Sequence, residues 1–213
     1  MNEDLVFYMN PNSRARIVRW MLEEIGQPYR AEQLDYRNTM KSPEYLAINP
    51  MGKVPAIQHR GVVVTECAAI CAYLADAFPE KGLAPAISDP LRGTYYRWMF
   101  FAAGPVEACV TDKALGVSVP ADMEAMVGYG KLDNVVATLE HALSKGDYLL
   151  GDRFSAADVY VGSQVGWSMF FGTLPKKPVF ERYWERLTAR PAAIRAKEID
   201  EALMAEQKAA EAG

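Results

Sequence analysis

A polar loop near the start of the chain carries the residues best suited to chemistry. The apolar run Leu5–Tyr8 gives way to Asn10-Pro11-Asn12-Ser13, and arginines follow at positions 14 and 16. If a helix begins here, its positive end and the hydroxyl and amide groups of the loop could donate hydrogen bonds to an anion. The loop therefore predicts either a plain turn or a site that holds a negatively charged reacting group.

The segment Asn49–Pro55 could present an extended backbone to a peptide. Pro50 and Gly52 form a turn, and Val54-Pro55 then opens a strand. Because an X-Pro bond becomes cis at a cost of only about 0.5–1 kcal/mol, a cis Pro55 would leave the N–H and C=O of Val54 unpaired and facing outward. These groups could pair with an extended peptide. From this motif alone, a structural turn is the better explanation.

The stretch from Thr65 to Ile70 closes a strand and opens a helix. The first N–H groups of that helix suit a carboxylate, and Glu66 could pair with an ammonium group. Together they match the zwitterionic end of an amino acid. Taken alone, Glu66 is better explained as an acid that complements the helix dipole.

The first 78 residues alternate between the periodicities of strands and helices. The clearest helix, at 13–25, has an apolar stripe, Ser13 as a suitable N-cap, and Gly26 at its end. The two strands that flank it should be parallel, and the last two, which form a hairpin, antiparallel. The expected elements are strands at 5–8, 29–34, 54–58 and 62–65, and helices at 13–25, 42–48 and 66–78.

The rest of the chain has a different pattern. Residues 79–88 are rich in Pro and Gly and predict a linker, and every later periodic segment has helical spacing. The expected helices lie near 90–117, 122–144, 155–171, 178–189 and 191–208. The predicted fold class is therefore α/β plus all-α: an α/β domain at 1–78 with the order βαβαββα, a linker at 79–88, and an all-helical domain at 89–213.

Two patterns in the helical part are interpreted mainly as structure. Ser155 and Asp158 have the spacing of a capping box, worth about 1 kcal/mol per cap. The aromatic clusters at 95–101 and 167–171 hold more rings than one helix face can bury. We expect most of these rings in the core and some of them in an apolar pocket.

Composition and charge exclude several classes of function. The chain has 213 residues, of which 50% are hydrophobic and 23% charged, and its formal net charge is −4. The acidic balance argues against nucleic-acid partners. No apolar run approaches the roughly 18 residues of a membrane span. The acidic start, MNEDLVFY, is unlike a signal peptide, so we expect a cytoplasmic protein.

The cysteines and histidines give no sign of a disulfide framework or a metal site. The chain has Cys67, Cys71 and Cys109, too few for such a framework. Cys67 and Cys71 lie one helical turn apart and are interpreted as packing residues. The two histidines, His59 and His141, do not combine with the cysteines into metal-ligand spacing, so no metal is expected.

Taken together, NPMGKVP, TECAAICAYL and GDRFSAADV, in this order and spacing, resemble the cytosolic glutathione transferases of bacterial type. The resemblance spans essentially the whole chain, and the helix RIVRWMLEEIGQPY also fits it. It implies a thioredoxin-like N-terminal domain, an all-helical C-terminal domain and a homodimer. It also implies glutathione as co-substrate, a small hydrophobic electrophile as second substrate, no metal, and a role in detoxification.

The resemblance also implies roles for individual residues. Val54 would pair its backbone with the cysteinyl part of glutathione beside a cis Pro55. Glu66 and Cys67 would hold the γ-glutamyl end. Cys67 departs from the family pattern, in which serine is common, so a hydroxyl donor is lost while the backbone N–H remains. The cations for the glycine carboxylate would be Lys41 and Lys53.

The donor that stabilises the thiolate of glutathione remains open. Ser13 has a hydroxyl at the helix start, and Asn10 can donate through its amide. These two are equally well placed. Tyr8, where tyrosine-type enzymes would have their donor, is third.

Two other functions share this fold. A glutathione-dependent disulfide reductase or peroxidase would need a reactive cysteine at the helix start, and the loop has none. A non-catalytic glutathione-transferase-like binding module is a different class of hypothesis, and the intact glutathione-contact motifs argue against it.

Overall fold

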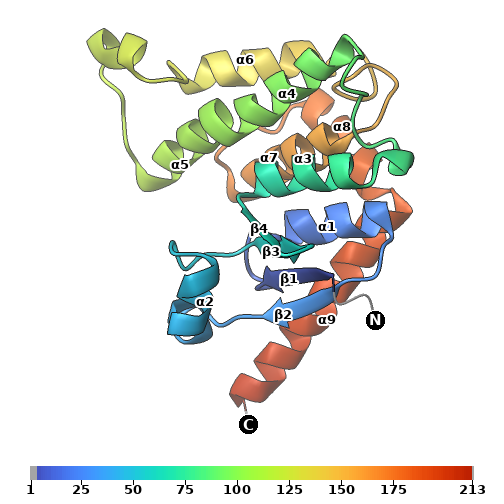
Figure 1. Ribbon diagram of the computed structural model, residues 1–213. Helices are drawn as coiled ribbons and strands as arrows, with labels where there is room; N and C mark the ends of the chain where they lie inside the picture. Colours follow the sequence, from blue (N-terminus) through green and yellow to red (C-terminus); the bar gives the residue numbers. More distant parts are fainter. Residues whose placement is uncertain (1–3, 213) are drawn as a thin grey trace. The chain divides into compact units, whose positions relative to one another are not determined.

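The computed structural model describes residues 4–212 (Figure 1). Contacts divide the chain into two compact units. The first unit contains the chain up to Lys81 together with residues from Ala189 onward, and the second contains Gly82–Thr188. Within the described residues, no helix is both long and apolar enough to cross a membrane.

The first unit is built around a mixed sheet with the strand order β2-β1-β3-β4. As predicted, β1 and β2 are parallel, and the hairpin of β3 and β4 is antiparallel. Side chains alternate between the two faces: Phe7 meets the guanidinium of Arg19 on one face, and Tyr8 packs against Tyr45 on the other. The strands are β1 (Leu5–Met9), β2 (Arg30–Gln33), β3 (Ala56–His59) and β4 (Val62–Thr65).

Helices cover the two faces of this sheet. Helices α1 and α3 lie on one face, and α2 lies on the other (Figure 1). The predicted apolar stripe of α1 is buried. The helical elements of this unit are α1 (Ala15–Ile25), η1 (Thr39–Lys41), α2 (Pro43–Ile48), α3 (Cys67–Ala77), η2 (Pro79–Lys81) and α9 (Pro191–Ala212).

The C-terminal helix α9 packs along α1 and belongs to the first unit. The division predicted from the sequence instead grouped this segment with the helices of 89–213. The periodicity of a segment shows that it is helical, but it does not show which surface the helix will cover.

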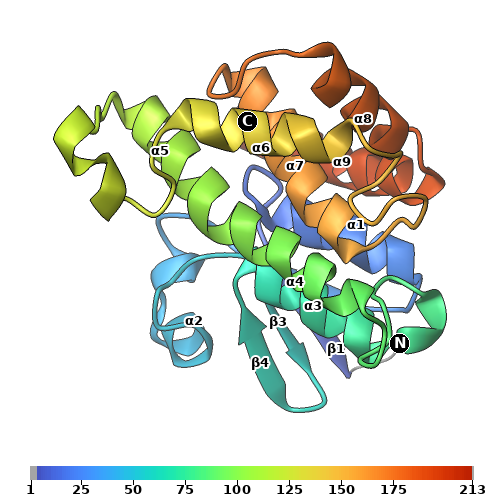
Figure 2. The same cartoon turned by 90° about the horizontal axis from the view of Figure 1, so that it is seen from above.

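The second unit is entirely helical in its main elements. Helix α7 is buried along most of its length and contacts α4 and α8 (Figure 2). Its elements are α4 (Leu91–Phe101), the π-helical η3 (Ala102–Val106), α5 (Glu107–Leu115), the 3-10 helix η4 (Ala121–Met126), α6 (Leu132–Leu143), α7 (Ala156–Phe171) and α8 (Pro178–Thr188).

Two predicted helices of this unit are interrupted. The helix expected at 90–117 contains a π-helical segment around Pro105, which has no N–H to donate to the regular ladder. The helix expected at 122–144 is wrong in its first half, because α6 begins only at Leu132. Residues 121–126 instead form the 3-10 helix η4, and Gly130, which lies between η4 and α6, has a φ of 65°, a left-handed conformation that an α-helix cannot continue through.

The aromatic clusters are partly buried and partly exposed. Tyr95 and Trp98 lie in the core, as expected. Phe100, Phe170 and Phe171 are exposed. Both clusters therefore contain more rings than the core of the second unit takes up.

His59 is a buried histidine at the end of β3. Its Nδ1 lies 3.0 Å from the Tyr73 hydroxyl, and its ring stacks on Phe78. Burial, and then the nearby charge of Arg60, lower the pKa of His59 below its usual value. The folded state therefore favours the neutral ring.

This lowered pKa predicts a loss of stability in mild acid. The unfolded chain takes up a proton below about pH 6.5, before the folded protein does, so the contribution of His59 is complete above that pH and falls below it. In urea unfolding, His59→Phe should lose less free energy of unfolding than the wild type between about pH 7.5 and 5.5. The exposed His141→Asn is the control and should follow the wild type. Equal losses in all three proteins would contradict the prediction.

Candidate active site

Two segments that are far apart in the sequence meet in the first unit. The Sγ of Cys67, the first residue of α3, lies 3.6 Å from the carbonyl oxygen of Arg14, just before α1. The start of α3 and the loop before α1 therefore lie side by side. From the sequence, the start of α3 is a candidate site for a carboxylate and an ammonium group, and the loop before α1 is a candidate site for an anion.

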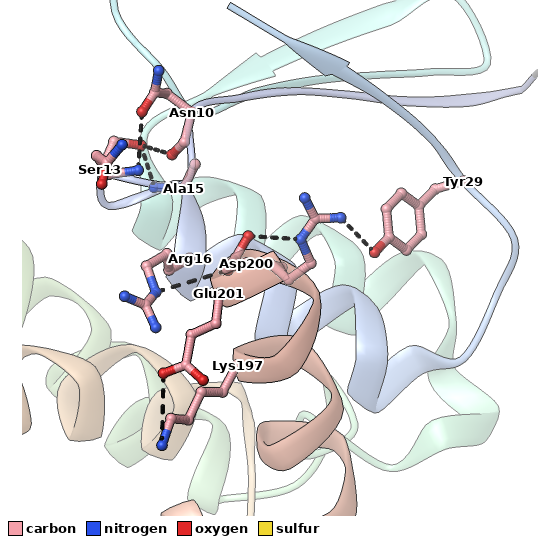
Figure 3. Close-up of polar contacts among 10 residues, drawn as sticks. Asn10, Ser13, Ala15, Arg16, Tyr29, Lys197, Asp200 and Glu201 are labelled. Carbon is pink, nitrogen blue, oxygen red and sulfur yellow. Dashed lines mark hydrogen bonds and ion pairs between the residues drawn. The ribbon is translucent and has the colours of Figure 1, made fainter. Parts of the chain in front are cut away.

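The loop before α1 is organised by two side chains. Asn10 is buried, donates from Nδ2 to the Leu34 carbonyl (2.7 Å), and accepts from the Asn12 N–H (2.9 Å). Ser13 is half-buried; its Oγ donates to the Asn10 carbonyl (2.7 Å) and accepts from the Ala15 N–H (3.0 Å) (Figure 3). Asn10 thus holds the loop, and Ser13 presents its hydroxyl at the start of the helix.

The N-cap of α1 is Arg14, so the prediction that Ser13 is the N-cap is wrong by one residue. Ser13 still serves the helix start, because its Oγ accepts the N–H of Ala15, the first helical residue. The residue therefore combines a structural role with a hydroxyl close to the helix terminus.

Tyr8 lies on the other face of the sheet from α1. Its ring packs on Tyr45 of α2, with 5.6 Å between the ring centroids, and its hydroxyl is 3.4 Å from Gln58 Oε1. The structure brings Ser13 and Asn10 together in one loop and leaves Tyr8 on the opposite side of the strand.

The Val54–Pro55 peptide bond is cis. The carbonyl of the preceding residue, Lys53, accepts hydrogen bonds from the Tyr45 hydroxyl (2.6 Å) and from Asn49 Nδ2 (2.8 Å). Burial raises the pKa of Tyr45 to about 12, so it stays a donor. Within residues 4–212, the N–H and C=O of Val54 make no hydrogen bond. The sequence analysis singled out the segment Asn49–Pro55, but it did not identify Tyr45 and Asn49 as the donors that hold the Lys53 carbonyl eight and four residues away.

Lys41 contacts the same loop from η1. Its Nζ donates to the Gly52 carbonyl (2.6 Å). Gly52 has a φ of 56°, and a Cβ there would lie 2.9 Å from Lys41 Nζ and from the Met40 carbonyl. The ammonium group thus holds the turn, and both Lys41 and Lys53 are exposed to solvent.

Glu66, the N-cap of α3, has an unusual backbone. Its φ of 67° and ψ of 122° lie outside the usual regions for a residue with a side chain. Such strain often occurs at functional positions. One turn later, Cys71 is fully buried, which raises the pKa of its thiol and agrees with a packing role.

Sequence reasoning also missed the contacts of α9 with this loop. Gln207 Oε1 accepts from Asn12 Nδ2 at 2.9 Å. Asp200 contacts two arginines of α1. Contacts between residues so far apart in the sequence cannot be predicted from a local sequence pattern.

Comparison with known families and relatives agrees with the geometry. The family model of the glutathione S-transferase N-terminal domain matches residues 13–77, and that of the C-terminal domain matches residues 107–193. A probable glutathione S-transferase of Oryza sativa subsp. japonica is 30% identical over 202 residues, which cover 81% of this chain and 86% of the relative.

Solved structures give the same result. A glutathione transferase of Methylococcus capsulatus is 30% identical, with a TM-score of 0.78, and the match covers 93% of this chain and 99% of the other. A sphingomonad glutathione S-transferase complexed with glutathione is 27% identical, with a TM-score of 0.75 and coverage of 92% and 98%. The cis Val54–Pro55, the adjoining starts of α1 and α3 and these relatives lead to one conclusion: the chain belongs to the glutathione S-transferase family.

Proposed function

We propose that this glutathione transferase ionises the thiol of bound glutathione beside Ser13, and that the thiolate attacks a hydrophobic electrophile. The contact between Cys67 Sγ and the Arg14 carbonyl carries the proposal, because it brings the start of α3 beside the loop that holds Ser13. The glutathione bound to the sphingomonad relative supports the choice of co-substrate.

Glutathione would lie along the residues assigned from the sequence. The N–H and C=O of Val54 would bond the cysteinyl backbone, as an added strand does. The first N–H groups of α3, at Cys67, would hold the γ-glutamyl carboxylate, and Glu66 would pair with its ammonium group. Lys41 and Lys53, both exposed, would meet the glycine carboxylate, and Lys41 also holds the loop through the Gly52 carbonyl.

The chemistry demands a modest stabilisation of the thiolate. The pKa of a free thiol is near 8.5 and must fall by about two units for the thiol to be largely ionised at neutral pH. This shift requires roughly 2.7 kcal/mol of preferential stabilisation of the thiolate. One hydrogen bond to a charged acceptor supplies about 1.5–3 kcal/mol. The positive end of α1 adds about 0.3–1 kcal/mol. Ser13 can provide the bond by turning its O–H from the Asn10 carbonyl to the thiolate.

The thiol proton would pass to solvent, and the thiolate would then attack an electrophilic carbon of the hydrophobic second substrate, forming a C–S bond by substitution or addition. In a substitution the leaving group departs with its electron pair, and in an addition the carbon framework takes up a proton. We further propose that the protein works as a cytoplasmic homodimer in detoxification, as the family resemblance implies.

Calorimetric titration with glutathione, followed by conjugation of a generic aryl halide, tests the proposed function. We expect both binding and turnover. Binding without turnover would identify a non-catalytic module. Turnover of disulfides but not of halides would identify a glutathione-dependent reductase.

Replacing Cys67 by serine should leave the KM for glutathione unchanged or lower it. The backbone N–H at this position is retained, and an added hydroxyl can contribute a hydrogen bond of about 0.5–1.5 kcal/mol, which corresponds to a two- to tenfold lower KM. Cys67→Val, which keeps the N–H but adds no hydroxyl, is the matched control. A large rise in KM for Cys67→Ser would refute the placement of the γ-glutamyl group.

A further inference from the structure

Polar contacts join the C-terminal part of the chain to α1 in a regular order. The last residues of α1 meet the segment before α9 and its first turn, and the loop before α1 meets the far end of α9. The pairs are Arg190 with Glu24, Arg195 with Glu23, Asp200 with Arg19 and Arg16, and Gln207 with Asn12. The two segments therefore run antiparallel, with contacts from the end of α1 to the candidate active-site loop.

Asp200 is the buried centre of this series. Its side chain is 1% exposed, and its Oδ1 accepts from Arg19 Nε at 3.1 Å. Arg19 is also buried, donates to the Tyr29 hydroxyl (2.9 Å), and lies over the rings of Phe7 and Tyr29. Buried ion pairs are often no more stabilising than apolar residues of the same volume, but their geometry is directional. This pair therefore forms a buried, directional contact between α9 and α1.

The second oxygen of Asp200 faces the first turn of α1. Arg16 Nε lies 3.8 Å from Asp200 Oδ2 (Figure 3). The charged groups that act on Asp200 are Arg19 and Arg16, which favour its carboxylate, and Glu23, which opposes it. Arg16 is 31% exposed, so it can be replaced without leaving a buried charge.

Arg16 connects Asp200 to Ser13. Its backbone N–H donates to the Ser13 carbonyl at 3.3 Å, while its side chain meets the carboxylate of Asp200. Two successive contacts, from Asp200 to Arg16 and from Arg16 to Ser13, thus connect α9 with the candidate thiolate donor. A shift of Arg16 would move the Ser13 carbonyl and, with it, the direction of the hydroxyl.

We propose that Asp200 is a positioning residue, which fixes the first turn of α1 through Arg16 and Arg19 and so aims the Ser13 hydroxyl at the thiol of glutathione. The inference rests on the proposed function in one respect, that Ser13 stabilises the thiolate. It concerns the orientation of the donor and not the binding of glutathione.

The test compares Arg16→Gln and Asp200→Asn with the wild type. Arg16→Gln retains the buried pair of Asp200 and Arg19, so it should fold normally. Glu201→Gln is the control, because Glu201 lies on the same helix and pairs with the exposed Lys197 (3.7 Å). The measurements are the ultraviolet absorbance of the glutathione thiolate and kcat/KM across pH.

In both test variants we expect the pKa of the bound thiol to rise by about one unit, so kcat/KM falls about tenfold on the acid side and recovers at high pH. The KM for glutathione should stay constant, and Glu201→Gln should match the wild type. Arg16→Lys should restore part of the lost activity. A merely structural role would lower activity by the same fraction at every pH, and that result would overturn the proposal.

Amide hydrogen exchange provides a readout that needs no turnover. Without glutathione, exchange at residues 10–17 should be faster in Arg16→Gln and Asp200→Asn than in Glu201→Gln, with the rest of the sheet unchanged. Unchanged exchange would overturn the positioning role. If the wild type fails to ionise glutathione, the proposed function is wrong. The amide hydrogen exchange at residues 10–17 then still decides whether Asp200 orders the loop before α1.

Discussion

Replacing Ser13 by alanine should lower kcat/KM for conjugation about 10- to 100-fold at neutral pH, with little change in the KM for glutathione. The loss is that of one hydrogen bond to a charged acceptor, about 1.5–3 kcal/mol. Ser13 also bonds the Asn10 carbonyl and the Ala15 N–H, but it is half-buried, so water can replace much of both bonds. The absorbance of the bound thiolate should fall in parallel.

Two further variants make the result specific. Tyr8→Phe should leave the thiolate absorbance unchanged, because the Tyr8 side chain lies on the face of the sheet covered by α2. Asn10→Ala should lower stability, because the buried side chain bonds both Leu34 and Asn12. If Asn10→Ala abolishes the thiolate in folded protein while Ser13→Ala retains it, Asn10 is the donor. If all three retain it, the donor is a backbone N–H or an arginine.

The elements of the first unit could be predicted because their signals are local. The apolar stripe of α1 and the left-handed Gly26 after it lie within a few turns of chain, and both are confirmed. The proline after Val54 likewise allowed a cis bond to be proposed from two residues, and the structure has it. Hydrophobic periodicity and the Gly and Pro residues at the ends of elements are sufficient to predict an element that is determined by its own residues.

The arrangement of the site could be predicted only in part. The resemblance pointed to two segments that lie side by side in the structure, but it could not show that Tyr8 points away from α1 or that Arg14, not Ser13, is the N-cap. The contact of Asn12 with Gln207 joins residues 195 positions apart, and no local pattern contains it. The geometry of the loop depends on such non-local packing.

Asp158 is a residue of the second unit whose loss should strongly lower stability. It is fully buried, and its Oδ1 accepts from the Leu149 N–H and the Tyr183 hydroxyl, both at 2.9 Å. Its Oδ2 accepts from the N–H and hydroxyl of Ser155, at 2.9 and 3.0 Å. The capping box expected from the sequence is confirmed, but the carboxylate also joins a loop and α8 to it.

Asp158→Ala should lower the free energy of unfolding by about 3–5 kcal/mol, because several buried donors lose their acceptor at once. Urea unfolding measures this loss. Asp152→Ala, an exposed aspartate in the same motif, is the matched control and should stay within about 0.5 kcal/mol of the wild type. A similar small loss for Asp158→Ala would contradict the buried network.

The pH dependence gives an independent check on Asp158. Burial raises the pKa of its carboxyl to about 6, with the hydrogen bonds from Leu149, Tyr183 and Ser155 opposing the rise. The folded protein therefore binds this proton more readily than the unfolded chain, so the contribution of Asp158 to stability declines as pH rises from about 4 to 6 and is constant above. Two pKa units correspond to roughly 3 kcal/mol. Asp158→Ala should lack this decline, whereas Asp152→Ala should retain it. A variant that keeps the full decline would show that another carboxyl titrates in this range.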